Sequence, residues 1–391
     1  MPNQEIIEFS AKLKDIAKDL SFLGHPRYPL KTLIKLFPEH HTFIAELEDE
    51  AIPFQINIAD KKRKMDDFLK QLSHSGLSPE IKAVFTKRIE DYHLLTSMME
   101  NFGKDQFYEN CKSLYGSSLT HSQNDAFFYF LEKMTDYCRP DINTEKLHGK
   151  DALKYLKDKM LETFPENEFE VKASTSLLSD SSAGRKTLKL NPHKSYTQGQ
   201  LNIFLVHEGW VHLGTSLNGA IQTEHPWLGT WAPRTTFLQE GLAILTELVT
   251  GHMTLERWNK ILLRHIATTM AEKGSPITDI YSYLRHHQLE ELDAFKLSLR
   301  VFRGVPLSGG AAFTKELLYL HGLIELLSHL NQHQNNLQGL WSGKMSFEEH
   351  AIIVNDPKIC LKYFPKALEE QDCQNRLSRL KQLSLSLQND F

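Results

Sequence analysis

The stretch LNIFLVHEGWVHLG, residues 201–214, places two histidines around a glutamate inside an apolar, helix-like segment. His207 and His212 are five residues apart, whereas the H-E-x-x-H helix of zinc peptidases separates its histidines by four. In a regular α-helix, five residues leave two side chains about 140° apart, against about 40° for a spacing of four. A π-bulge would return both imidazoles to one side, and Gly209 would ease that distortion.

Glu208 directly follows the first histidine. A catalytic zinc uses three protein ligands and one water, and a nearby carboxylate takes a proton from the attacking water. Glu208 is therefore the candidate general base. For the third ligand, the sequence favours Glu240 in QEGLAILTE, where we expect a helix to begin after a loop and an antiparallel return. The predicted metal ligands are His207, His212 and Glu240. A chance pattern of plain surface or core histidines is the competing interpretation.

The 391 residues are 41% hydrophobic and 24% charged, which is typical of one large or two ordinary globular domains. The formal net charge of −4 gives no general attraction to nucleic acid or to an anionic membrane. Apolar runs are far shorter than the ~20 residues of a membrane span, and no secretory leader is recognisable, so we expect a cytoplasmic protein. The four cysteines form no C-x-x-C pair, which leaves histidines and carboxylates as metal ligands.

Apolar residues recur at helical spacing through residues 1–145, and a boundary is expected at CRPDIN, residues 138–143. We therefore predict an N-terminal helical region, 1–145, and a second domain, 146–391. The segments FEVKASTSLL (169–178) and RKTLKLNP (185–192) are predicted to form a β-hairpin around the turn-like SDSSAG. In zinc peptidases of this general plan, the edge strand beside the metal helix binds substrate as an added strand, a role that RKTLKLNP could have. A hairpin that merely packs on the helix is the alternative.

The sequence also resembles a known family. Four blocks carry the resemblance in the family's order and cover roughly residues 100–391: LVHEGWVHLGTSLNGAIQ, LQEGLAILTELVTG, AFKLSLRVFRG and FTKELLYLHGLIELL. They resemble the family named for its QEGLA motif, which includes bacterial flavohaemoglobin expression-modulating proteins and eukaryotic microtubule-associated tyrosine carboxypeptidases. The resemblance implies that HExxxH supplies two zinc ligands and the base, and that the glutamate of QEGLA supplies the third ligand. It also implies removal of a C-terminal tyrosine, as characterised eukaryotic members do on tubulin tails.

One block departs from the family pattern. The family runs quickly from R-G into a K-D-x-x-Y-L segment, whereas here VPLSGGAAF intervenes and the acidic residue is Glu316. This difference leaves the loop geometry near a substrate site open.

A carboxypeptidase must bind a free terminal carboxylate, which the planar fork of arginine does best. Arg300 and Arg303 are the leading candidates, followed by Lys315, and a structural ion pair is the alternative for each arginine. Tyr319 or His321 could donate a hydrogen bond to the developing oxyanion, although packing is the commoner role of such a tyrosine. Glu247, seven residues after Glu240, could orient a ligating histidine.

The predicted fold is therefore α+β and predominantly helical, with a zincin-like metallopeptidase domain, a small β-sheet and an N-terminal helical part. The predicted function is a Zn²⁺-dependent carboxypeptidase that acts on the C-terminal tail of a peptide or protein and binds neither nucleic acid nor membrane. Two alternatives stay open: a non-catalytic, metal-stabilised binding protein, and a zinc endopeptidase or amidase. Oligomeric state is not predicted.

Overall fold

The computed structural model of the protein describes residues 3–20, 56–118, 125–140, 145–175, 177, 179–333 and 337–388. Backbone contacts divide the chain into two compact units: residues 1–11, 124–259 and 319–391 form the first, and residues 12–123 and 260–318 the second. Each unit is discontinuous along the chain. The contiguous regions 1–145 and 146–391 stay a prediction, and residues 141–143 of their proposed boundary lie outside the described residues.

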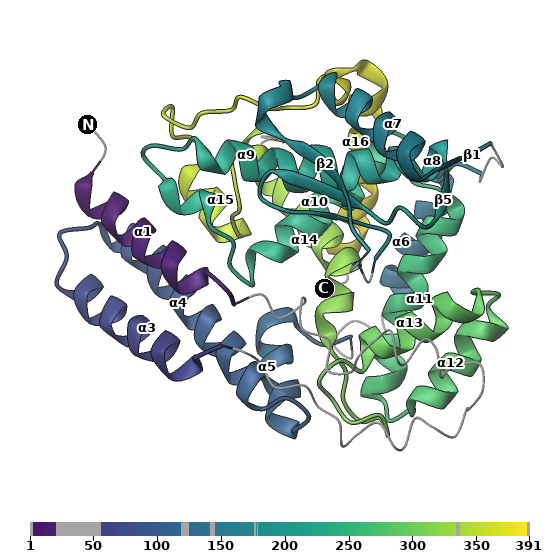
Figure 1. Ribbon diagram of the computed structural model, residues 1–391, viewed down its shortest axis with the longest axis horizontal. Helices are drawn as coiled ribbons and strands as arrows, with labels where there is room; N and C mark the ends of the chain where they lie inside the picture. The colour runs from purple at the N-terminus through teal and green to yellow at the C-terminus, as the bar shows by residue number, and fades with distance from the viewer. Residues whose placement is uncertain are drawn as a thin grey trace. The chain divides into compact units, whose positions relative to one another are not determined.

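Helices dominate both units, so the predicted α+β, predominantly helical class is confirmed (Figure 1). The first unit contains α6 (Asp125–Met134), α7 (Gly149–Leu161), α8 (Gln198–Phe204), α9 (Gly214–Ala220), α10 (Thr235–Val249), α15 (Phe347–Ile353) and α16 (Gln371–Gln388). The second contains α3 (Ile58–Ser73), α4 (Pro79–Glu100), α5 (Asp105–Tyr115), α12 (Ile277–His286) and α13 (Glu291–Val301). Three helices include residues of both units: α1 (Gln4–Ala17), α11 (Leu255–Glu272) and α14 (Leu318–Gln332).

Local sequence signals fix several helix starts. Ser78 accepts a hydrogen bond from the Ile81 backbone at the start of α4, and Pro79 occupies the first turn, where its missing N–H costs nothing. Thr197 and Gln200 form a reciprocal capping box at the start of α8. The capping box therefore fixes where α8 begins, ahead of the metal motif that follows this helix.

The strands of the first unit pair differently from the prediction. Strand β4 (Thr187–Leu190) lies between β2 (Glu170–Ala173), to which it is parallel, and β3 (Ser181–Ala183), to which it is antiparallel. The predicted hairpin of the segments 169–178 and 185–192 is therefore wrong, since the tight turn joins β3 to β4. The missed strand β3 lies in the supposed turn and has only Ser and Ala, whose strand preference is weak, so tertiary pairing decides its conformation.

This pairing also corrects the predicted docking edge. RKTLKLNP contains β4, the central strand, whose two sides are already hydrogen-bonded, so it offers no free edge. The edge beside the metal helix is β3. A second, two-stranded antiparallel sheet pairs β1 (Lys146–His148) with β5 (Ser195–Thr197).

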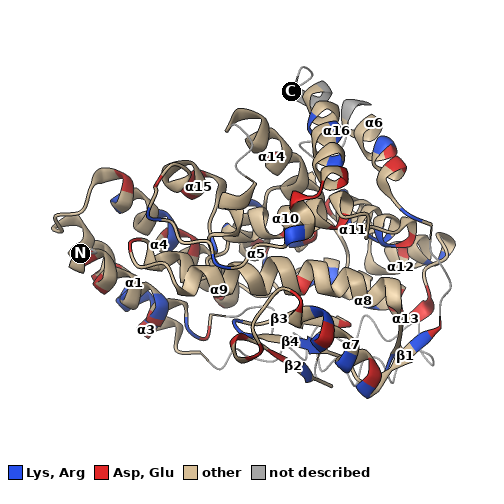
Figure 2. Cartoon of the chain, turned by 90° about the horizontal axis from the view of Figure 1, so that it is seen from above, with Lys and Arg blue, Asp and Glu red and all other residues tan. Residues whose placement is uncertain are grey.

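The core of the first unit packs the sheet and α7 against the metal helix. Alternation along β4 buries Leu188 and Leu190 and exposes Lys189. Helix α7 contributes Leu156 and Met160 to the same core, while its opposite face carries interspersed acidic and basic residues (Figure 2). In the described part of the chain, no helix combines the length and apolarity required to cross a bilayer.

Candidate metal centre

The segment Leu205–Leu213 forms a π-helix that continues α8 and leads into α9. The widened turn expected from the five-residue spacing is thus confirmed. The rings of His207 and His212 lie with their centroids 4.8 Å apart and their planes at 85°. Gly209 has a different explanation from the expected one: its φ is not positive, and a Cβ there would lie 2.4 Å from Sδ of Met160. The glycine therefore leaves room for α7.

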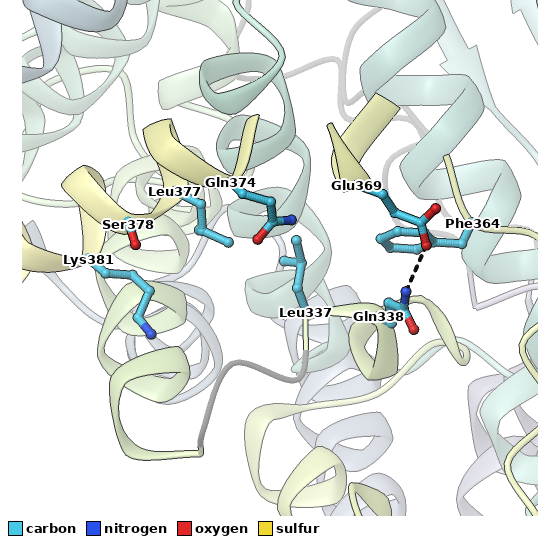
Figure 3. Close-up of a pocket in the computed structure, with 8 residues that line it drawn as sticks. All are labelled: Leu337, Gln338, Phe364, Glu369, Gln374, Leu377, Ser378 and Lys381. Atoms are coloured by element: carbon cyan, nitrogen blue, oxygen red, sulfur yellow. Dashed lines mark hydrogen bonds between the residues drawn. The ribbon is translucent and has the colours of Figure 1, made fainter. Parts of the chain in front are cut away.

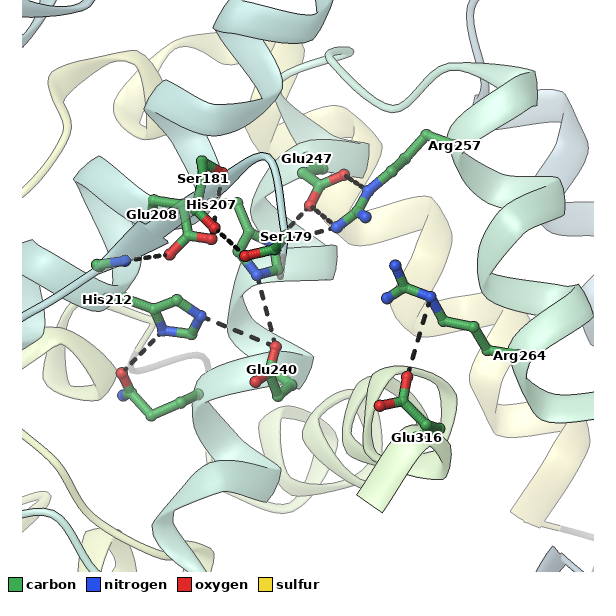
Figure 4. Close-up of polar contacts among 12 residues, drawn as sticks. Ser179, Ser181, His207, Glu208, His212, Glu240, Glu247, Arg257, Arg264 and Glu316 are labelled. Carbon is green, nitrogen blue, oxygen red and sulfur yellow. Dashed lines mark hydrogen bonds and ion pairs between the residues drawn. The ribbon is translucent and has the colours of Figure 1, made fainter. Parts of the chain in front are cut away.

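Helix α10 brings Glu240 to the two histidines. Its Oε2 lies 3.5 Å from Nε2 of His207 and 3.8 Å from Nε2 of His212 (Figure 4). Ligand atoms of these three residues all lie within 4.8 Å of one another. The predicted start of a helix at Glu240 is wrong, because α10 begins at Thr235. The carboxylate is therefore presented from within a regular, buried helix.

His207 is held through its other ring nitrogen. Nδ1 lies 2.7 Å from Oε1 of the fully buried Glu247, and Arg257 in turn donates to both oxygens of Glu247, from Nε at 3.2 Å and from Nη2 at 3.1 Å. The predicted contact of Glu247 with a candidate ligand is confirmed. Burial alone lowers the pKa of His207, but its hydrogen bonds to Glu240 and Glu247 outweigh burial and raise the pKa to about 10. The surroundings of this ring therefore strongly favour a cation.

Glu208 points to the edge of the sheet. Its Oε2 accepts a hydrogen bond from the Ala183 backbone at 2.7 Å, and its Oε1 lies 3.4 Å from the Ser181 hydroxyl (Figure 4). In an antiparallel pair, backbone groups alternate between facing the partner strand and facing away from it. The Ala183 N–H faces away from β4 and orients the carboxylate. The candidate base and the edge strand are thus fixed to each other.

Tyr319 lies beside the cluster because α10 and α14 approach closely. A Cβ on Gly241 would lie 2.2 Å from the backbone oxygen of Gly322, so only glycine permits this helix crossing. Three residues before Gly322, the Tyr319 ring stacks on His207 with centroids 6.4 Å apart. The glycine of the QEGLA segment therefore has a packing reason, and Tyr319 is a neighbour of the candidate ligands.

The candidate carboxylate-binding residues lie in the second unit. Arg300 donates from Nε at 3.0 Å and from Nη2 at 2.8 Å to Oε1 of the buried Glu316. Burial raises the pKa of Glu316, but Arg300, Arg264 and Lys315 outweigh it and lower that pKa. The Arg303 guanidinium lies 5.7 Å from the centre of the Phe313 ring, and burial lowers the pKa of Arg303 to about 10. For Arg300 the structural ion pair anticipated as the alternative is present.

The substrate roles of Arg300, Arg303 and Lys315 stay predictions. The inserted segment VPLSGGAAF contains Gly309 and Gly310, both with positive φ, at 92° and 86°. Its backbone thus uses conformations that L-residues other than glycine rarely adopt.

Several contacts of the cluster were not predicted from sequence, including that of Arg257 with Glu247. His212 Nδ1 lies 3.5 Å from Oε1 of Gln239, Lys344 donates to that same oxygen, and Ala183 binds Glu208. Gln239 could have been suspected because it adjoins Glu240 on the same helix. Lys344 carries no local signal, since it follows His212 by 132 residues in the chain. Burial lowers the pKa of Lys344 to about 7, although Glu240 and Glu208 oppose that shift.

The only described group of three or more His, Cys, Asp or Glu residues that could hold a metal ion is His207, His212 and Glu240. Two imidazoles and a carboxylate are a donor set that hydrolytic zinc sites use, with a fourth position left for water. His207 Nδ1 is engaged by Glu247, which leaves its Nε2 directed at Glu240. The residues therefore fit a zinc ion.

A surface groove in the first unit has a different character. Its lining mixes apolar and polar side chains, and Gln338 donates a hydrogen bond to Glu369 across it (Figure 3). The lining residues are Leu337, Gln338, Phe364, Glu369, Gln374, Leu377, Ser378 and Lys381. None of them belongs to the metal cluster.

No curated protein matches the chain in sequence. A family model described as microtubule-associated tyrosine carboxypeptidase matches residues 39–371, which extends further toward the N-terminus than the four blocks of the sequence resemblance. The match contains all three candidate ligands, Glu208 and Tyr319. The chain belongs to the microtubule-associated tyrosine carboxypeptidase family.

Proposed function

We propose that this protein is a zinc-dependent metallocarboxypeptidase that removes a C-terminal tyrosine from a peptide or protein. The observation that carries the proposal is the convergence of His207, His212 and Glu240 within 4.8 Å in a member of a tyrosine carboxypeptidase family. The zincin-like character of the fold is part of the same proposal. It is supported by a metal helix flanked by an antiparallel edge strand.

His207, His212 and Glu240 hold the metal in this proposal. Zinc bound there supplies a Lewis acid that polarises the scissile carbonyl and acidifies water. His207 offers Nε2 because Glu247 engages Nδ1, and this contact fixes the ring orientation. The chain thereby holds the donor atoms in place before substrate arrives.

Glu208 acts as the general base and accepts the proton of the attacking water. The Ala183 N–H orients its carboxylate, and the same proton can pass to the leaving amine. Tyr319, which stacks on His207, is the proposed donor to the oxyanion that forms on the scissile carbonyl. The substrate chain is proposed to lie along β3, which would place its scissile bond beside the carboxylate that β3 orients; the Ala183 N–H, already bound to Glu208, does not pair with it.

The terminal carboxylate of the substrate requires a cation, and Arg303 is the preferred candidate. Arg300 already makes two hydrogen bonds to Glu316, which favours a structural role for it. Lys315 contributes to the positive potential around that glutamate.

The deciding experiment uses the purified full chain, zinc and peptides that end in tyrosine. Mass spectrometry should detect release of the last residue, and Glu208→Gln should retain zinc but lose cleavage, because it removes the base and leaves the predicted ligands intact. Peptides with an amidated C-terminus should be poor substrates.

If the wild-type chain binds zinc but cuts no peptide, the enzymatic proposal is wrong and a metal-stabilised binding protein is favoured. Cleavage within a peptide, with equal use of amidated ends, would instead point to an endopeptidase.

A further inference from the structure

The two candidate histidine ligands are held by chemically different partners. Glu247, a buried carboxylate, binds Nδ1 of His207 at 2.7 Å. His212 Nδ1 instead faces a neutral amide oxygen, Oε1 of Gln239, at 3.5 Å. A neutral amide can point either its oxygen or its nitrogen at the ring, so something must select the orientation.

Lys344 makes that selection. Its Nζ lies 2.7 Å from Gln239 Oε1 and 2.9 Å from the backbone oxygen of His212. Lys344 donates from Nζ to the amide oxygen, and in its ammonium form it has no lone pair that could accept from the amide nitrogen, so the amide turns its oxygen toward Lys344. The Thr215 hydroxyl lies 2.8 Å from the same oxygen. The oxygen of Gln239 is thus surrounded by groups that can donate to it.

The amide nitrogen shows that this orientation is enforced. Gln239 is 3% exposed, and within the described residues its Nε2 is buried with no hydrogen-bond partner. A buried donor without a partner is unfavourable, so the contacts of the oxygen outweigh that loss. With the oxygen facing the ring, His212 keeps its hydrogen on Nδ1 and leaves the lone pair of Nε2 available.

The loop that carries Lys344 is fixed independently of the metal. The Lys344 backbone N–H donates to the oxygen of Leu228 at 2.8 Å, and a Cβ on Gly343 would lie 2.6 Å from Cβ of Leu228. Trp341 Nε1 donates to the backbone oxygen of Trp210, within the π-helix, at 2.9 Å. The ammonium is therefore delivered to Gln239 from a segment tied to the metal helix.

We propose that Gln239 and Lys344 are positioning residues, through which the chain fixes the tautomer and orientation of His212 for metal binding. The proposal rests on the proposed function, because it presumes that His212 is a ligand. In this proposal Gln239 has a function of its own, distinct from that of the adjacent ligand Glu240.

The test compares Gln239→Leu, Gln239→Glu and Lys344→Met with the wild-type chain. Zinc affinity is measured by competition with a chromophoric chelator. The geometry of the ligands is followed in the visible spectrum of the Co²⁺-loaded protein. The stability of the metal-free chain is measured by thermal unfolding in excess chelator. Gln338→Leu, the same change at an exposed groove residue, is the matched control.

Gln239→Leu should lower zinc affinity about 10–100-fold, as losses of outer partners of metal-bound histidines do, and should alter the Co²⁺ spectrum. Lys344→Met should shift both readouts in the same direction without lowering the unfolding temperature of the metal-free chain, since it also removes a desolvated charge. Gln239→Glu keeps an acceptor facing His212 and should restore most of the affinity.

Wild-type affinity and an unchanged Co²⁺ spectrum in both Gln239→Leu and Lys344→Met would overturn this inference alone. If Gln239→Leu does not fold, Lys344→Met and Gln239→Glu decide the matter. A wild-type chain that binds neither metal would instead refute the proposed function first.

Discussion

The first unit contains two pairs of neighbouring histidines, buried except for the partly exposed His212, with opposite surroundings. His207 and His212 face Glu240 and Glu247, whereas His329 Nε2 and His350 Nδ1 lie 2.8 Å apart and the His329 ring packs on Phe347. The carboxylates raise the pKa of His207 to about 10.

At the other pair, burial lowers the pKa of His329 and of His350 to about 4. Burial is the largest cause at both rings; His329 adds to the shift at His350, His333 adds to both shifts, and Glu348 opposes the shift at His329. Burial is common to both pairs, so the difference lies in the neighbouring charges. Carboxylates turn one pair into a place for a cation, while the other stays neutral and structural.

The largest effect is expected when the first pair loses its shared carboxylate. Glu240→Gln removes an anionic ligand and makes the cluster more like the second pair. Peptide cleavage should fall by at least about 100-fold, because even the loss of outer partners costs about 10–100-fold. Zinc content by elemental analysis and product formation by mass spectrometry measure the effect. Undiminished zinc with full activity would remove Glu240 from the ligand set.

A smaller effect is expected from Glu247→Gln, which gives His207 a neutral partner like that of His212. Zinc affinity should fall about 10–100-fold. The metal-free chain should also lose stability, by about 1–3 kcal/mol, because Arg257, whose side chain is 19% exposed, is left without its carboxylate. Chelator competition and urea unfolding measure the two effects. Glu256→Gln, an exposed neighbour, is the control, and equal behaviour of the two variants would contradict this role of Glu247.

The smallest effect on zinc binding and cleavage is expected from His329 and His350, which act on the pH dependence of stability. Unfolded histidines titrate near 6.5, while His329 and His350 titrate near 4 in the folded chain, so the unfolded state binds more protons between these values. The contribution of this pair to the free energy of unfolding should therefore be fully present above about pH 6.5 and should fall, by about 2–3 kcal/mol for each ring, as the pH drops to 4.

Urea unfolding in excess chelator measures this loss without interference from bound metal. His350→Gln should flatten the pH dependence, because it removes one titrating ring and keeps a hydrogen-bond partner for His329. His286→Gln, at an exposed histidine, should retain the wild-type slope. An unchanged slope in His350→Gln would show that the pair does not govern acid stability.

The helical character of most segments and the widened turn could be predicted because they depend on local patterns. Apolar spacing and the histidine spacing of residues 207 and 212 act within a few residues. The predicted start of α10 is wrong, since the helix begins at Thr235 and not at Glu240. Sheet pairing could not be predicted in the same way. Strand β3 has no strand-like residues, and its conformation depends on β4 and on the contact of Ala183 with Glu208.

The sequence by itself determined the donor types and their approximate geometry: two histidines that meet only on a widened turn, an adjacent carboxylate, and a second carboxylate after a loop. Tertiary structure decided how those donors are held. Gln239 and Glu247 reach the cluster from α10, which also carries Glu240, whereas Lys344 reaches it from a separate segment. Lys344 contacts a histidine 132 positions earlier in the chain. Such a contact depends on tertiary packing and therefore produces no pattern in the local sequence.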